Sequence, residues 1–299
     1  MLNRLAVKPG DKIGILSTAR WMDQTEMKFA DELLLSWGLK PVYGETITAR
    51  SEQFAGDDNL RSKDLQTFLD DADIKAILCA RGGYGTIRIM DKIDFTGFMN
   101  NPKFICGFSD ITVLFAHITD KLGIPVLHSA MPFTFPNNSE AALQTLKDAL
   151  FGIAPAYSIP AHPLNIFGET EAELIGGNLS ILYSLLGTKY GFSTSGKILF
   201  IEDIDEYRYH IDRMMWSMKL AGKLHPLKGL IIGGLTDIKD NLVPFGKSAE
   251  SIILEQVQEL NIPVCFGFPA GHQDDNRALY LGRKVVLKTE KTHSSLTYI

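Results

Sequence analysis

The sequence predicts an α/β protein whose sheet is parallel and carries helices on both faces. Short apolar runs typical of buried strands alternate with longer segments in which apolar residues recur at helical spacing. A composition of 45% hydrophobic and 22% charged residues provides for a substantial core. At 299 residues the chain exceeds the usual length of one domain, so we expect two.

Strand and helix patterns alternate through the first half of the chain. Met27, Ala30 and Trp37, for example, recur at the spacing of one helix face. Binding sites in parallel sheets form at the loops that follow the strands. The segments RGGYG at 81–85 and FSD at 108–110 stand at such positions. We expect strands at 12–16, 39–44, 74–80, 104–107 and 124–129, and helices at 25–37, 60–72 and 110–122.

The second half of the chain is less regular. Residues 151–169 combine prolines with mixed polarity and no clear period, which indicates a linker or a crossing segment. The sequence therefore predicts an N-terminal domain over 1–150, a linker over 151–171 and a smaller mixed α/β domain over 172–299. In that last domain we expect strands at 196–203, 229–235, 262–268 and 283–288, and helices at 206–219 and 248–260.

Charge and cysteine content exclude several classes of protein. The net charge of −5 and the scattered basic residues argue against nucleic-acid binding. No apolar segment approaches the ~20 residues of a membrane helix, and no signal-peptide core precedes Pro9. Cys79, Cys106 and Cys265 lie far apart in apolar runs, which favours buried thiols in a reducing, cytoplasmic compartment. No ligand cluster indicates a metal, and we expect no cofactor.

Ser109 stands at the bend between an expected strand and an expected helix. A serine at that position is commonly a helix N-cap. However, Asp110 is itself a good cap, and Gly107 permits the tight turn of a nucleophile elbow. The last glycine of the usual G-x-S-x-G pattern is replaced by Ile111. On this segment alone, both a cap and a nucleophile remain open.

The adjacent glycines of RGGYG at 81–85 also have two interpretations. They form either a simple tight turn after a strand or a row of exposed N–H groups beside Ser109, as half of an oxyanion hole. No G-x-G-x-x-G or Walker pattern for phosphate is present. Sequence order does not separate the two interpretations.

A serine nucleophile needs an imidazole base that is oriented by a carboxylate. Among the seven histidines, His272 is favoured because it lies in a glycine-containing loop after an apolar strand, and His128 is the second choice. Glu202 is favoured as the carboxylate because it is the first polar residue at the end of a strand. The neighbouring Asp203 is expected to cap the next helix.

Seven segments, taken in order, resemble the LD-carboxypeptidase family of serine peptidases. They are GDKIGI, ARGGYG, GFSDIT, HSAMP, GGNLS, FIEDIDE with a trailing DR, and GHQDDNRALYLG. The resemblance runs from about Pro9 to Val286, and the combination of ARGGYG with GFSDIT is specific. This family contains muramoyltetrapeptide carboxypeptidases and microcin C self-immunity peptidases.

The resemblance implies both a fold and a set of site residues. It implies a flavodoxin-like N-terminal domain, with the active site in the cleft to the C-terminal domain and usually a homodimer. It implies that Ser109 is the nucleophile, Glu202 the orienting carboxylate and His272 the general base and acid. The backbone N–H groups of Gly83 and Asp110 would form the oxyanion hole.

The resemblance also implies a substrate, the murein tetrapeptide, from which D-alanine is released through an acyl-enzyme during cell-wall recycling. Arg81 is a candidate for holding the substrate carboxylates, although an ordinary surface or core-lining arginine fits equally well. Two alternatives stay open: a self-immunity peptidase that acts on a microcin-like toxin, and a noncatalytic α/β anion-binding protein.

The chain departs from the family pattern at two places. A His-Gly-Pro-Met turn reads here as His128-Ser129-Ala130-Met131, and Tyr280 replaces a proline. We expect both departures to lie near the cleft and to bear on substrate preference.

Overall fold

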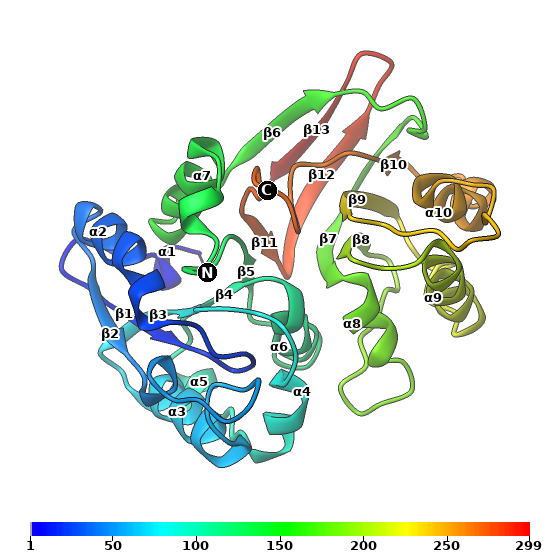
Figure 1. Ribbon diagram of the computed structural model, residues 1–299. Helices are drawn as coiled ribbons and strands as arrows, with labels where there is room; N and C mark the ends of the chain where they lie inside the picture. The colour runs from blue at the N-terminus through cyan, green and yellow to red at the C-terminus, as the bar shows by residue number, and fades with distance from the viewer. Residues whose placement is uncertain (1) are drawn as a thin grey trace.

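Two β-sheets, each covered by helices, make up the computed structural model, which describes residues 2–299 (Figure 1). The first sheet has the strand order β11-β5-β4-β3-β1-β2, and the second has the order β10-β9-β8-β7-β12-β13-β6. The α/β class predicted from the sequence is confirmed. No helix within residues 2–299 combines the length and the apolar character needed to cross a membrane.

The first sheet comes mainly from the first half of the chain. Its strands β2-β1-β3-β4-β5 run parallel in the flavodoxin-like order, as expected. The strands are β1 (Lys12–Leu16), β2 (Lys40–Tyr43), β3 (Ile74–Cys79), β4 (Phe104–Gly107) and β5 (Val126–His128). The helices are α1 (Leu2–Leu5), α2 (Lys28–Ser36), α3 (Asp58–Asp70), α4 (Thr86–Ile89), α5 (Thr96–Asn100), α6 (Thr112–His117) and α7 (Glu140–Leu150).

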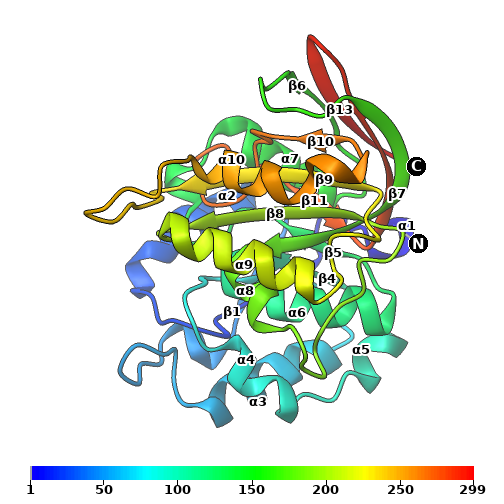
Figure 2. The ribbon, with the colours of Figure 1, turned by 90° about the vertical axis from the view of Figure 1, so that its right-hand side faces the viewer.

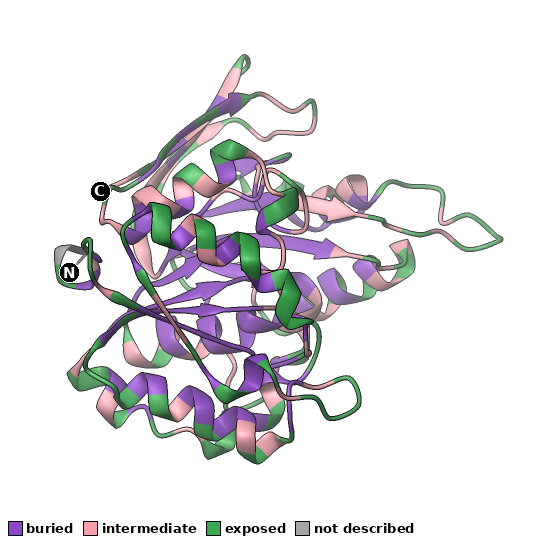
Figure 3. Ribbon diagram, turned by 60° about the vertical axis from the view of Figure 1, so that its left-hand side comes forward, coloured by how far each residue is buried: buried purple, intermediate pink, exposed green. Residues whose placement is uncertain are grey.

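Burial on both faces explains why the central strands are continuous apolar runs. Along β1 and β3 the side chains alternate between two core clusters, with Ile13 and Leu78 in one and Leu16 and Ile77 in the other. Parallel sheets are covered on both faces, so neither face needs polar residues. Figure 3 shows the result, with buried strands inside and exposed residues on the outer sides of the helices.

The second sheet joins a parallel half to an antiparallel half at β7. Its helices α9 and α10 lie side by side over β8 and β9 (Figure 2). The strands are β6 (Ala156–Pro160), β7 (Gly168–Asn178), β8 (Ile198–Ile204), β9 (Gly229–Thr236), β10 (Val264–Cys265), β12 (Arg283–Thr289) and β13 (His293–Tyr298). The helices are α8 (Leu179–Ser184), α9 (Arg208–Leu220) and α10 (Ala249–Val257).

Four strands, β6, β7, β11 and β13, lie outside the predicted strands, and β6 and β11 change the expected organisation. The expected linker contains β6, an edge strand in which Tyr157 and Ile159 point inward while their neighbours are exposed. Proline is tolerated on an edge strand, so Pro160 does not prevent this pairing. The second difference is β11 (Leu279–Leu281), which pairs antiparallel with β5 and so returns the end of the chain to the first sheet.

Candidate active site

Ser109 occupies a strained turn directly after β4. It begins a 3-10 helix (Ser109–Ile111) with a φ of +64°, in the left-handed region that side chains other than glycine rarely adopt. The 3-10 helix has no side-chain cap, and neither has α6. The cap interpretation of Ser109 is therefore wrong, and so is the expectation that Asp110 caps the helix. A strained serine between a strand and a helix is the geometry of a nucleophile elbow.

Glu202 and His272 form a buried pair at the carboxyl end of β8. His272 Nδ1 donates to Glu202 Oε2 at 2.6 Å, and the backbone N–H of His272 donates to the same oxygen at 3.1 Å. The His272 loop can approach β8 closely because residue 271 is a glycine. A Cβ at that position would lie 2.6 Å from the Cβ of Glu202. Glycine therefore fixes the contact between the two elements.

Opposing electrostatic effects act on this pair. Burial by itself lowers the pKa of His272, but the Glu202 charge and hydrogen bond outweigh it and raise the pKa above its ordinary value. Burial acts to raise the pKa of Glu202, yet the His272 charge holds it below its ordinary value. Glu202 is therefore an anion that orients the imidazole and leaves Nε2 free.

A chain of contacts links the Ser109 elbow to the strand that carries Glu202. Thr112, which begins α6, accepts a hydrogen bond on Oγ1 from the N–H of Asn178 at 3.0 Å. Gly177 allows this approach, since a Cβ there would lie 2.4 Å from Thr112 Oγ1. Asn178 is the register partner of Glu202 between β7 and β8. The two halves of the site are thus joined through a side-chain hydroxyl of α6 and the backbone of β7.

The ring of Phe108 connects the elbow to the imidazole from the other side. Its centroid lies 4.7 Å from that of His272, in an edge arrangement. A hollow of about 190 Å³ opens beside these two rings. Its lining is Phe108, Thr134, Asn137, Asn138, Ile204, His272, Gln273 and Asp274.

The glycine loop after β3 packs against Ser109. A Cβ on Gly82 would lie 2.9 Å from the Cβ of Ser109 and 3.0 Å from its Oγ. Gly83 has a φ of +110°, and its N–H and that of Asp110 take no part in the turn and loop hydrogen bonds of residues 2–299. This loop is therefore a tight turn that also leaves the exposed Gly83 N–H outside the turn and loop hydrogen bonds, so the two interpretations of its glycines are compatible.

Four side chains hold the glycine loop in place. The Asp110 carboxylate accepts from the N–H of Thr86 at 2.8 Å, and the Thr86 hydroxyl bonds that of Thr18, also at 2.8 Å. The fully buried Arg61 donates to the carbonyls of Gly85 at 2.9 Å and Thr18 at 2.6 Å. We call this set of residues, Thr18, Arg61, Thr86 and Asp110, the loop anchor. Sequence reasoning missed Arg61 and Thr86, because neither stands in a motif.

Arg81 lies half-buried at the start of the same loop. Its guanidinium stacks on Phe133 at 4.0 Å, and Nη1 donates to the carbonyl of Trp21 at 3.3 Å. Arg81 is therefore held against neighbouring residues at the base of the glycine loop and is not a freely exposed side chain.

Other candidates take structural positions. His128 is fully buried among phenylalanines, and burial lowers its pKa to about 4, so it is a poor base. Asp203 accepts from Asn178 Nδ2 at 2.9 Å and from the N–H of Ser180 at 2.8 Å. It therefore fixes the start of α8, and the expectation that it caps the next helix is wrong. Burial raises its pKa to about 7, with a further contribution from the Glu202 charge.

Both departures from the family pattern are buried. Ser129 and Ala130 are inaccessible, and Ser129 donates its N–H to the carbonyl of Gly107 at 2.8 Å, directly below the elbow. Tyr280 lies in a core cluster of the first sheet and donates its hydroxyl to the carbonyl of Ala149 at 2.6 Å. The expectation that Tyr280 lies near the cleft is wrong, because its position on β11 directs it into the core.

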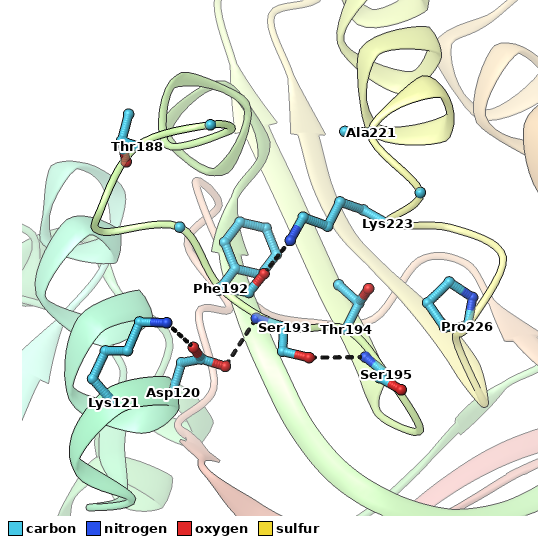
Figure 4. A pocket seen from close by; sticks show the side chains of 13 residues that line it. Asp120, Lys121, Thr188, Phe192, Ser193, Thr194, Ser195, Ala221, Lys223 and Pro226 are labelled. Atoms are coloured by element: carbon cyan, nitrogen blue, oxygen red, sulfur yellow. Dashed lines mark hydrogen bonds and ion pairs between the residues drawn. The ribbon is translucent and has the colours of Figure 1, made fainter.

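A separate hollow of about 520 Å³ lies between the end of α6 and the loops that precede β8 and β9 (Figure 4). Asp120 joins the two halves of the chain there by accepting from the N–H of Ser193 at 2.8 Å. Within residues 2–299, no group of His, Cys, Asp and Glu side chains is placed to hold a metal ion.

The fold and the site define an α/β protein of two sheets that carries a serine on a strained turn after β4 and a hydrogen-bonded Glu–His pair at the end of β8. Residues 13–129 match the model of the LD-carboxypeptidase N-terminal domain, and residues 171–287 match that of the LD-carboxypeptidase C-terminal domain. The chain therefore belongs to the LD-carboxypeptidase family and is a serine-type carboxypeptidase.

Relatives with known names agree with this assignment. The probable murein peptide carboxypeptidase of Bacillus subtilis (strain 168) is 36% identical, over 96% of this chain and 92% of that protein. The murein tetrapeptide carboxypeptidase of Pseudomonas aeruginosa is 30% identical, over 82% of each chain.

Solved structures share the fold. The crystal structure of muramoyltetrapeptide carboxypeptidase from Oxalobacter formigenes matches with a TM-score of 0.88 at 27% identity, covering 96% of this chain and 98% of that one. The microcin C7 self-immunity protein MccF in complex with aspartyl sulfamoyl adenosine matches with a TM-score of 0.84 at 22% identity, covering 98% of this chain and 97% of that one. The second likeness supports the fold alone.

Proposed function

We propose that this protein is an LD-carboxypeptidase that releases the C-terminal D-alanine from murein tetrapeptides during peptidoglycan recycling. The observation that carries the proposal is the Glu202–His272 hydrogen bond of 2.6 Å, with the His272 ring 4.7 Å from that of Phe108, the residue that precedes a serine held at a φ of +64°. The relatives from Bacillus subtilis and Pseudomonas aeruginosa, at 36% and 30% identity, are both named for murein peptides, which favours this substrate.

In this mechanism Ser109 is the nucleophile and His272 the proton carrier. His272 Nε2 takes the hydroxyl proton as Ser109 Oγ attacks the carbonyl carbon before the D-alanine. The resulting imidazolium, stabilised by Glu202, returns the proton to the leaving amine, and the C–N bond breaks. Water, deprotonated by His272, then attacks the acyl-enzyme ester and restores the serine. General acid–base transfer of this kind contributes ~10²–10⁴ in rate.

The oxyanion in this mechanism is held by the backbone N–H groups of Gly83 and Asp110. The contact of Gly82 with Ser109 supports this role for the glycine loop, because Gly83 directly follows the residue that touches the proposed nucleophile. Loss of one oxyanion donor typically reduces kcat by ~10²–10³. Arg81, on the same loop, is proposed to bind a substrate carboxylate.

A serine-directed fluorophosphonate tests the nucleophile, and D-alanine release tests the substrate. We expect the wild type and the control Ser36→Ala, an exposed serine on α2, to be labelled and to release D-alanine from a murein tetrapeptide. Ser109→Ala is expected to be unlabelled and inactive. Labelling of Ser109→Ala would remove this residue from the mechanism, while labelling of the wild type without D-alanine release would reject the substrate.

The same proposal includes a homodimer in the cytoplasm. The resemblance to the family supports the dimer, and the buried free thiols of Cys79, Cys106 and Cys265 are compatible with a reducing compartment. Light scattering of the purified protein tests the homodimer, and cell fractionation tests the cytoplasmic location. No observation specifically favours the toxin-immunity alternative, and membership of a carboxypeptidase family argues against a noncatalytic binding protein.

A further inference from the structure

Two arginines border the glycine loop beside Ser109 without an acidic partner. Among the residues that the structure describes, the arginines that pair with carboxylates are Arg61, Arg88, Arg208 and Arg277. Arg20 and Arg81 form no such pair.

Arg20 lies directly on the loop. A Cβ on Gly83 would lie 2.9 Å from the Cβ of Arg20 and 3.4 Å from its Cδ, so the side chain runs along Gly83. The backbone N–H of Arg20 donates to the carbonyl of Gly82 at 3.3 Å. Arg20 and Gly83 are both exposed, so the Arg20 guanidinium lies at the solvent-accessible surface of the glycine loop.

Arg81 approaches the same place from the base of the loop. Phe133 and the carbonyl of Trp21 hold its guanidinium, which leaves most of its five N–H donors unused. Burial lowers the pKa of Arg81, the charge of Arg20 lowers it further, and the charge of Glu26 acts in the opposite direction. The Glu26 carboxylate accepts a hydrogen bond from the N–H of Asp23 at 2.7 Å and forms an ion pair with neither arginine in the described chain, so an anionic group beside both arginines is electrostatically favoured. The pair is therefore suited to bind an anionic group.

The chemistry of a carboxypeptidase identifies that anion. When a single C-terminal residue leaves, its carboxylate carbon is three bonds from the attacked carbonyl carbon, within about 4 Å. The carboxylate must therefore lie close to Ser109 and to the glycine loop. Guanidinium groups bind carboxylates through paired, charge-assisted hydrogen bonds.

Resting on the function proposed above, we propose that Arg20 and Arg81 together bind the free C-terminal carboxylate of the substrate and restrict the enzyme to the chain end. Arg81 supplies a fixed guanidinium, and Arg20 supplies a mobile one that closes on the carboxylate. A peptide that ends in an amide, or that continues beyond the cleaved bond, lacks the anion.

A comparison of two substrates tests this pair. A murein tetrapeptide with a free D-alanine carboxylate and the same peptide ending in D-alaninamide are hydrolysed by the wild type, Arg20→Gln and Arg81→Gln. We expect the wild type to prefer the free acid, and each substitution to reduce kcat/KM for the acid by about 10–100-fold, mainly through KM. Hydrolysis of the amide is expected to change little.

The control is Arg213→Gln, which makes the same change in net charge on α9, where Arg213 stacks on Tyr209 at 5.2 Å. It is expected to keep the acid preference. An unchanged acid-to-amide ratio in Arg20→Gln overturns the proposal for the exposed arginine, whose replacement carries little risk of misfolding. Fluorophosphonate labelling separates the two hypotheses: a wild type that is labelled but shows no acid preference contradicts the arginine pair alone, while an unlabelled wild type contradicts the serine mechanism.

Discussion

At the scale of single residues, the pKa of His272 is set by two opposing effects, burial, which lowers it, and the Glu202 charge, which raises it. The structure resolves their balance in favour of the charge, so the pKa of His272 lies above its ordinary value of 6.5. The neutral imidazole is the form that can accept the serine proton. The activity of the free enzyme should therefore fall as the pH drops through the raised pKa of His272.

Replacing Glu202 by Gln tests this balance. The substitution removes the charge but keeps burial, so the pKa of His272 should fall and the acid limb of the kcat/KM profile should move to lower pH. The plateau should drop by ~10²–10⁴, because the imidazole loses its orientation and the stabilisation of its charged form. pH–rate profiles of tetrapeptide hydrolysis measure both effects.

Glu206→Gln is the matched control for this experiment. Glu206 pairs with His210 on α9 and not with His272, so the same loss of charge should leave the acid limb in place. An acid limb that does not move in Glu202→Gln contradicts the assignment of His272 as the titrating base.

At the scale of elements, the glycine loop depends on residues that do not touch substrate. The loop anchor fastens it to α3, to the loop after β1 and to the elbow, through Arg61, Thr18 and Asp110. Asp110 thereby contributes twice, because its carboxylate holds the loop while its N–H belongs to the proposed oxyanion hole.

Thr86→Val is predicted to loosen this loop. It removes the hydroxyl that bonds Thr18 and keeps the backbone N–H that bonds Asp110. A displaced Gly83 N–H weakens transition-state binding, so kcat should fall by about 10-fold while KM hardly changes. Thr119→Val is the control, since its buried hydroxyl bonds the carbonyl of Phe115 at 2.7 Å, away from the loop. Equal kcat values for Thr86→Val and Thr119→Val would contradict the prediction.

The elements also show what the sequence could and could not predict. β1, β3 and β4 were predicted because burial on both faces makes them apolar runs, and Ser109 and Glu202 because they follow or end such runs. β7 was missed, since its first half is polar and its second half contains the glycine pair that receives α6. Arg61 was missed because an arginine within a helix ordinarily indicates an exposed face, whereas here it is fully buried.

At the scale of the whole molecule, the two halves of the chain are not independent in the first sheet. β11, from near the C-terminus, forms one edge of that sheet and pairs with β5. No local pattern could have predicted this pairing, because it depends on where β10 ends and how the chain returns. The loop between β10 and β11 contains His272, so the return of the chain to the first sheet also carries the proposed base to the nucleophile.

Tyr280→Ala is therefore predicted to destabilise both halves together. Tyr280 is completely buried on β11, its ring lies 5.5 Å from that of Phe104, and its hydroxyl bonds the carbonyl of Ala149. Truncating a buried aromatic side chain typically costs about 3–5 kcal/mol. Because β11 is continuous with the loop of His272, urea unfolding followed by circular dichroism and by tryptophan fluorescence should shift as one transition. The exposed Tyr209→Ala should shift neither signal, and a Tyr280→Ala protein in which the two signals separate would mean that the halves unfold independently.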